Sequence, residues 1–103
     1  MDLGIKGLRV MISAGAQGIG LAVARAFVRE GAVVSVCDVN VAAVDALGAS
    51  DPAIHAFVCD VANRAQVKQW FDLALAHLGG LDCLINNAGI AGPTGKVDEI
   101  DPE

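Results

Sequence analysis

The chain has 103 residues, of which 54% are apolar, and its seven basic and twelve acidic side chains give a net charge of −5. This length allows one domain with a modest core, and the apolar content argues against a disordered chain. Because the basic residues are scattered and no apolar run reaches the length of a membrane span, we expect neither a nucleic-acid partner nor a membrane partner.

The cysteines and histidines predict no metal site. Cys37, Cys59 and Cys83 are odd in number, lie in or beside predicted strands and form no C-x-x-C pair. Buried reduced thiols fit this pattern better than disulfides or metal ligands, and a cytoplasmic location follows. His55 and His77 lie far along the chain from any cluster with ligand spacing, so we expect ordinary packing roles for them.

The first half of the chain predicts two strands and two helices. Residues 8–13 form an apolar run that predicts a strand, and 32–37 form a β-branched run that predicts a second. Between them a helix is expected from Gly18 to Gly31. Its apolar positions recur at helical spacing and are Ile19, Ala22, Val23, Ala26 and Phe27. A short helix capped by Asn40 is expected to run through Leu47 and end near Gly48 and the Asp51-Pro52 turn.

The second half repeats the pattern. Residues 54–59 predict a third strand and 81–86 a fourth. Between them, Asn63 with Gln66 three positions later predicts a capping box that opens a helix ending at Gly79. The expected buried face of this helix is Val67, Trp70, Phe71, Ala74 and Leu78.

Alternating strands and helices predict an α/β fold with a parallel sheet in the order 3-2-1-4 and helices on both faces, a Rossmann-like sheet truncated after the fourth strand. Ligands of such sheets bind at the carboxyl ends of the strands, where the winding direction reverses. The turn after the first strand and the segment after the fourth are therefore expected to meet at one site.

The last three residues, Asp101, Pro102 and Glu103, have the composition of a helix start. This suggests a piece of a longer protein, with an acidic solvated tail as the alternative.

A glycine-containing turn, Ser13-Ala14-Gly15-Ala16-Gln17-Gly18-Ile19-Gly20, follows the first strand. Glycines at such a turn let backbone N–H groups approach an anionic pyrophosphate, and the positive end of the helix dipole adds attraction. The alternative is that Gly15, Gly18 and Gly20 serve only close packing of the helix against the strand.

Asp38 stands at the end of the second strand, eighteen residues after Gly20. A carboxylate there accepts hydrogen bonds from the hydroxyls of an adenosine ribose and repels a 2′-phosphate. Gln17, Val39 and Asn40 are neutral and supply no cation for that phosphate, so NAD is favoured over NADP. A plain turn or cap role for Asp38 is the alternative.

Together with Asp60-Val61 after the third strand and Asn86-Asn87-Ala88-Gly89 after the fourth, these motifs resemble the amino-terminal half of the short-chain dehydrogenase/reductase family, over almost the whole chain. The resemblance implies that residues 1–103 are the amino-terminal part of an NAD(P)-binding Rossmann domain. It implies these cofactor-binding residues: Ser13, Gly15, Gln17, Gly18, Ile19, Gly20, Asp38, Asp60, Val61, Asn87, Ala88 and Gly89. In that family the acid equivalent to Asp60 bonds the adenine amino group. For Asn86 a structural role, satisfying backbone groups, is favoured.

One position departs from the family pattern, because Ala14 stands where the first glycine is usual and Gly15 follows one position later. We expect Ala14 to adopt a conformation open to ordinary residues, with Gly15 supplying the slack. Cofactor affinity is the property that this departure affects.

The family's catalysis uses a Tyr-x-x-x-Lys pair with a Ser and an Asn, and the chain contains no Tyr. Lys96 lies in a loop and does not take that role, so no catalytic residue is assigned and the chain alone is expected to be inactive. A longer form would act on an alcohol or ketone substrate and be a homo-oligomer.

Two alternative functions remain. The first is a stand-alone nucleotide-binding or interaction module, whose exposed fourth strand would recruit a partner. The second is a methyltransferase of similar fold, and the Asn-Asn-Ala-Gly segment after the fourth strand argues against it.

Overall fold

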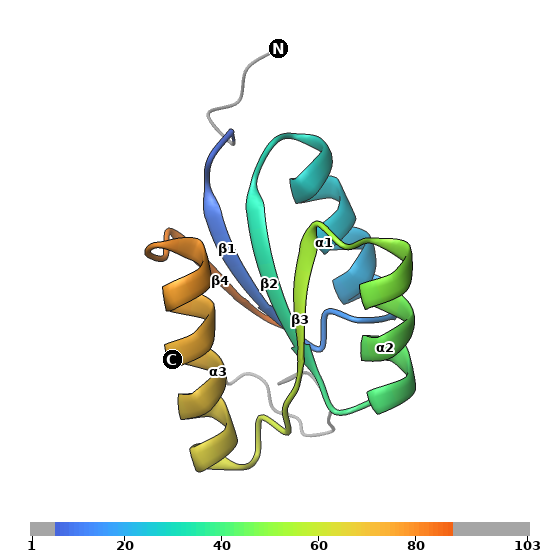
Figure 1. The fold of residues 1–103 in the computed structure, drawn as a ribbon, viewed down its shortest axis with the longest axis vertical. Coiled ribbons are helices and arrows are strands. Elements are labelled where there is room, and N and C mark those ends of the chain that lie inside the picture. Colours follow the sequence, from blue (N-terminus) through green and yellow to red (C-terminus); the bar gives the residue numbers. More distant parts are fainter. Residues whose placement is uncertain (1–5, 88–103) are drawn as a thin grey trace.

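The computed structural model describes residues 6–87 of the chain (Figure 1). Four strands alternate with three helices, as the sequence predicts. Their bounds are β1 Arg9–Ser13, α1 Gly18–Arg29, β2 Val33–Asp38, α2 Val41–Ser50, β3 Ile54–Val58, α3 Arg64–Leu78 and β4 Cys83–Asn86.

The strands form one parallel sheet in the order β3-β2-β1-β4, which confirms the predicted topology. Ser13 at the end of β1 is in register with Cys37 of β2 on one side and Asn86 of β4 on the other. The carboxyl ends of these three strands therefore lie together at one edge of the sheet. Within residues 6–87, β4 pairs with β1 alone, and its Leu84 side chain is 48% exposed.

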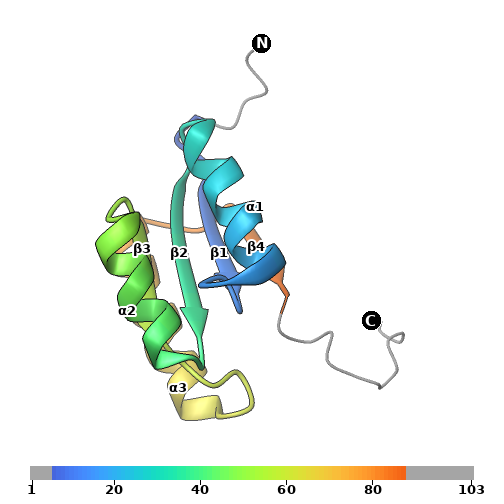
Figure 2. The ribbon, with the colours of Figure 1, turned by 90° about the vertical axis from the view of Figure 1, so that its right-hand side faces the viewer.

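Helices cover both faces of the sheet, with α1 and α2 on one and α3 on the other (Figures 1 and 2). Alternating side chains of the strands supply both cores, because successive residues of a strand point to opposite faces. Val10 and Ile12 of β1 pack toward α1 and α2, whereas Met11 packs toward α3.

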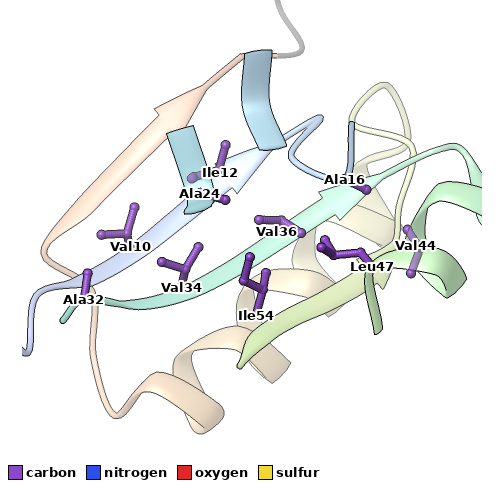
Figure 3. Close-up of a cluster of buried hydrophobic side chains, with 10 residues drawn as sticks. All are labelled: Val10, Ile12, Ala16, Ala24, Ala32, Val34, Val36, Val44, Leu47 and Ile54. Carbon is purple, nitrogen blue, oxygen red and sulfur yellow. The ribbon is translucent and has the colours of Figure 1, made fainter. Parts of the chain in front are cut away.

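The first core is drawn in Figure 3, where β-branched residues of the strands lie beside small residues from α1 and its preceding turn. The second core is built around Trp70, Ala74 and Leu78 of α3, with Val67 and Phe71 partly buried beside them. This confirms the predicted buried face of α3. Among the helices of residues 6–87, none has both the length and the apolarity needed to cross a bilayer.

The predicted buried face of α1 is partly wrong. Ile19 is 76% exposed and Ala22 is also exposed, whereas Gly20 and Ala24 are the buried residues of the helix. Gly20 and Ala24 have small side chains or none, so α1 lies close to the sheet at these two positions. The larger apolar residues of the helix are partly buried beside them, namely Leu21, Val23, Phe27 and Val28.

α2 ends at Ser50 with Asp51 as its C-cap residue, which confirms the predicted end near Gly48 and the Asp51-Pro52 turn. Gly48 is exposed and does not adopt a positive φ. The helix is held by burial of Val44 and Leu47, and this tertiary packing outweighs the low helix propensity of one glycine.

Candidate functional site

The candidate site lies at the carboxyl ends of β1, β2 and β4, where the winding direction of the sheet reverses. Two hydrogen bonds join segments that are 73 residues apart in the chain. The hydroxyl of Ser13 donates to Asn86 Oδ1 at 3.0 Å, and the side-chain amide of Asn87 donates to the carbonyl of Ala14 at 3.3 Å. The predicted meeting of the glycine turn with the segment after β4 is confirmed. The Asn87 amide thus satisfies a backbone carbonyl, the role that was favoured for Asn86, whereas Asn86 accepts from a side-chain hydroxyl.

Two glycines of the turn are required by close packing. A Cβ on Gly20 would collide with the carbonyl oxygen of Ala14 and lie 2.9 Å from Asn87 Nδ2. A Cβ on Gly15 would lie 2.6 Å from Cβ of Val36 in the neighbouring strand. The packing interpretation therefore accounts for these two positions.

Gly18 is different, because a Cβ there would meet nothing within 4 Å. Its φ of +61° lies in the left-handed region, which favours glycine for conformational reasons. Gly18 is the first residue of α1, so this conformation sets the direction in which the helix begins.

The expectation for Ala14 is wrong. Its φ is 55°, in the left-handed region that an L residue adopts only at a cost of about 1–2 kcal/mol. Gly15 does not have a positive φ, so the left-handed conformation falls on Ala14 and not on the glycine. The chain must leave β1 sharply to bring Gly15 N–H to the carbonyl of Cys37 at 3.0 Å, and Ala14 takes the strain of that turn.

The amino end of α1 is open. Its N-cap residue Gln17 makes no side-chain capping bond, and the first turn holds no acidic residue. The first N–H groups of a helix have no partner within the helix, so those of Gly18 and Ile19 point outward with the positive end of the dipole. Gln17, Gly18 and Ile19 are all exposed, which leaves this end accessible to an anion.

Asp38 is 5% exposed and braces the turns on either side of it. One carboxylate oxygen accepts from Ala16 N–H at 3.2 Å, and the other accepts from Asn40 N–H at 3.1 Å. The Asn40 side chain in turn donates to Gln17 Oε1 at 3.4 Å. Asp38 therefore has the turn role that was its alternative, and each oxygen retains a second lone pair for a further donor.

The segment after β3 is exposed and held in place by local bonds. Asp60 Oδ1 accepts from Ala62 N–H at 2.9 Å, and Asp60 N–H donates to Gln66 Oε1 at 2.8 Å. The predicted capping box is therefore half right. Asn63 accepts from Gln66 N–H at 3.1 Å, but the Gln66 side chain binds Asp60 instead of returning to Asn63.

Sequence reasoning missed Val39 as a candidate contact residue. Its side chain follows Asp38 directly and is 66% exposed, and Val61 is exposed at the next strand end. The available signal was an apolar residue standing just outside a buried strand. Exposed apolar side chains beside a polar edge suit the flat face of a base.

The cysteines near this edge are free, and Cys37 and Cys59 are buried as predicted, while Cys83 is half-buried. Burial is the main cause that raises the pKa of the Cys37 thiol to about 12, so it is no nucleophile at neutral pH. No cluster of three or more potential metal ligands occurs in the part of the chain that the structure describes. Ala88, Gly89 and Lys96 lie outside the described residues.

The family model for short chain dehydrogenases matches residues 9–103. Momilactone A synthase from Oryza sativa subsp. japonica is 44% identical over 89 residues, which are 81% of this chain and 31% of that protein. D-threitol dehydrogenase from Mycolicibacterium smegmatis is 36% identical over 94 residues, which are 87% of this chain and 36% of that protein. The chain thus spans about a third of the length of these relatives.

Two solved structures also match this chain in fold and sequence. A 3-ketoacyl-(acyl-carrier-protein) reductase from Brucella melitensis, complexed with NADH, matches with a TM-score of 0.73 and 26% identity, over 78% of this chain and 33% of the other. A mutant of a Serratia marcescens short-chain dehydrogenase/reductase matches with a TM-score of 0.75 and 29% identity, over 90% of this chain and 41% of the other.

Proposed function

We propose that this chain, which belongs to the short-chain dehydrogenase family, is the NAD-binding part of an oxidoreductase that interconverts an alcohol and a ketone. The observation that carries the proposal is the meeting of three features at one sheet edge. These are the open amino end of α1, the carboxylate of Asp38 and the amide of Asn87. A bound nicotinamide dinucleotide supplies the hydride chemistry, and the residues of this edge bind and orient it.

The pyrophosphate is assigned to the amino end of α1. The N–H groups of Gly18 and Ile19 donate to it there, and the absence of a Cβ on Gly20 lets the helix begin close to the end of β1. Ser13, Gly15 and Gln17 shape the turn that holds these donors. Asn87 fixes the turn from the side of β4 and, with Ala88 and Gly89, borders the adenosine ribose.

The adenosine ribose is assigned to Asp38. Its two oxygens already accept from backbone N–H groups, which keeps the carboxylate in one orientation, and their remaining lone pairs suit the two ribose hydroxyls. The residues in contact with this carboxylate, Ala16 and Asn40, are neutral, as is Gln17 beside them. A 2′-phosphate would meet a negative charge with no cation to offset it, so NAD is preferred over NADP.

The adenine is assigned to the exposed edge beyond β2 and β3. Val39 and Val61 provide apolar surface for the ring, and Asp60 accepts from its amino group. The bond from Asp60 N–H to Gln66 holds this acid in place against α3.

Turnover is assigned to a longer form of the protein. The 103 residues contain no Tyr to exchange a proton with the substrate oxygen, and the chain spans about a third of the relatives above. Residues 1–103 form the amino-terminal part of one cofactor-binding domain. This part alone binds the dinucleotide without catalysing a reaction. The longer form is a cytoplasmic homo-oligomer, and the reduced cysteines fit that location.

The second candidate is a stand-alone nucleotide-binding or interaction module. It is favoured by the half-exposed Leu84 on β4, which pairs on one side only within residues 6–87. An exposed strand edge of this kind invites pairing with another chain.

The test is isothermal titration of the folded chain with NADH and, separately, with NADPH. We expect saturable binding that prefers NADH and that is lost in Asp38→Ala. Asp45→Ala is the matched control, because Asp45 is an exposed carboxylate in α2 away from the strand ends. A folded chain that binds neither dinucleotide, or an Asp38→Ala variant that binds NADH as tightly as the parent, would contradict the proposal.

A further inference from the structure

A polar network lies inside the core between α3 and the sheet, away from the site described above. The indole N–H of Trp70 donates to Ser35 Oγ at 3.1 Å, and Ser35 Oγ lies 3.0 Å from Nδ1 of His55. Ser35 is fully buried and Trp70 nearly so. These bonds join the middle of α3 to β2 and β3.

The donors and acceptors of this network suit a neutral His55. An indole N–H only donates, so Ser35 Oγ is the acceptor of the bond from Trp70. In the tautomer with its proton on Nε2, Nδ1 of His55 accepts the hydroxyl hydrogen of Ser35 across the 3.0 Å contact. A protonated His55 donates from both ring nitrogens, so Nδ1 can then no longer accept from the fully buried Ser35 hydroxyl.

A second imidazole makes the charge still less favourable. The ring of His77 stacks on His55 with centroids 4.0 Å apart and planes 8° apart. His77 lies in the last turn of α3, where the helix dipole favours a positive charge. Two protonated rings in this stack would repel each other. Burial first, and the charge of His77 second, lower the pKa of His55 from its ordinary value.

The other groups that face His55 are uncharged. Ser35 approaches from β2, Trp70 lies behind it on α3, and Phe57 of the same strand lies 4.5 Å away between ring centroids. No carboxylate among the described residues is paired with the ring to stabilise its protonated form. Of these neighbours, His77 is the titratable side chain, and its ring stacks directly on His55.

We propose that His55, His77, Ser35 and Trp70 form an acid-sensitive contact that holds α3 on the sheet at neutral pH and weakens when the two histidines are protonated. Because the folded state binds the proton on His55 less readily than the unfolded state, stability is complete above the ordinary histidine pKa of 6.5. It falls as the pH drops below that value and through the lower pKa of the folded state. The proposal is independent of the cofactor assignment.

The experiment is an NMR titration of the two imidazoles in the full chain, combined with urea unfolding at pH 7.5 and pH 5.5. Trp70 is the only tryptophan, so its fluorescence reports unfolding at this contact. We expect His55 to titrate below 6.5, and the urea midpoint to be lower at pH 5.5 than at pH 7.5. His77→Gln is expected to reduce that difference. Lys68→Gln, which removes an exposed positive charge from α3, is expected to leave it unchanged.

Three results would overturn the proposal. The first is a His55 that titrates at or above 6.5, as both histidines would in a chain that does not fold. The second is a urea midpoint that does not change between the two pH values. The third is a His77→Gln variant with the full acid sensitivity of the parent. Ser35→Ala gives an independent check, because loss of the bond to Nδ1 removes one reason for neutrality and should raise the pKa of His55.

Discussion

Adding one methyl group at two different helical glycines should have opposite effects on stability. In Gly20→Ala the new Cβ would meet the carbonyl oxygen of Ala14 and the amide of Asn87. Neither atom moves freely, because one belongs to the backbone and the other is already bonded to it. In Gly48→Ala the new Cβ meets nothing within 4 Å.

The magnitudes follow from these surroundings. Forcing an extra methyl group into a packed site costs about 1–3 kcal/mol, and alanine recovers up to about 1 kcal/mol over glycine in a helix. We expect Gly20→Ala to lose roughly 1–2 kcal/mol of unfolding free energy and Gly48→Ala to gain about 0.5–1 kcal/mol. With a urea dependence of about 1 kcal/mol per M, the two midpoints should differ by about 2 M.

The assay is urea unfolding followed by far-ultraviolet circular dichroism, with both variants compared with the parent in the same buffer. Equal slopes would show that the midpoints report stability alone. A Gly20→Ala variant as stable as the parent would refute the packing argument at the start of α1. A Gly48→Ala variant less stable than the parent would refute the conclusion that Gly48 is an unconstrained helical residue.

Two further predictions concern the ends of β1. Because Ala14 has a φ of 55°, in the left-handed region, we expect Ala14→Asn to be tolerated. The β-branched Ala14→Val should destabilise the chain by about 1–2 kcal/mol, measured by thermal unfolding. Equal stability of the two variants would contradict the left-handed conformation. Hydrogen bonds from Arg9 hold the pKa of Asp82 at about 2, below its ordinary value of 3.8. The stabilisation from this pair is therefore complete above pH 3.8 and is lost as the pH falls through about 2. In acid unfolding, the difference in stability between the parent and Asp82→Asn should shrink over that interval. A difference that stays constant would contradict the lowered pKa of Asp82 in the folded state.

Much of the site was readable from the sequence because its signals are local. The apolar run before Ser13, the glycines after it and the acid at Asp38 predict a strand, a turn and a strand end that point to one edge. The parallel topology then follows from the alternation of strands and helices, since crossovers of one hand leave few arrangements. The bonds from Ser13 to Asn86 and from Asn87 to Ala14 confirm the resulting contact between distant segments.

The errors arose where distant residues decide the outcome. Gly15 N–H bonds the carbonyl of Cys37 in the neighbouring strand, and Ala14, not Gly15, takes the left-handed conformation of the turn. The side chain of Gln66 accepts from the N–H of Asp60 instead of from the N–H of the cap residue Asn63.

The sequence by itself determined the order of the elements, the faces of α3 and the edge where the chemistry-bearing residues gather, because hydrophobic periodicity and turn residues act over short distances. The tertiary structure alone decided the conformation of Ala14, the bonds that orient Asp38 and the stacking of His55 on His77. Those features depend on which side chains are brought together by packing of the sheet against its helices. That packing joins residues whose separation in the chain carries no local pattern.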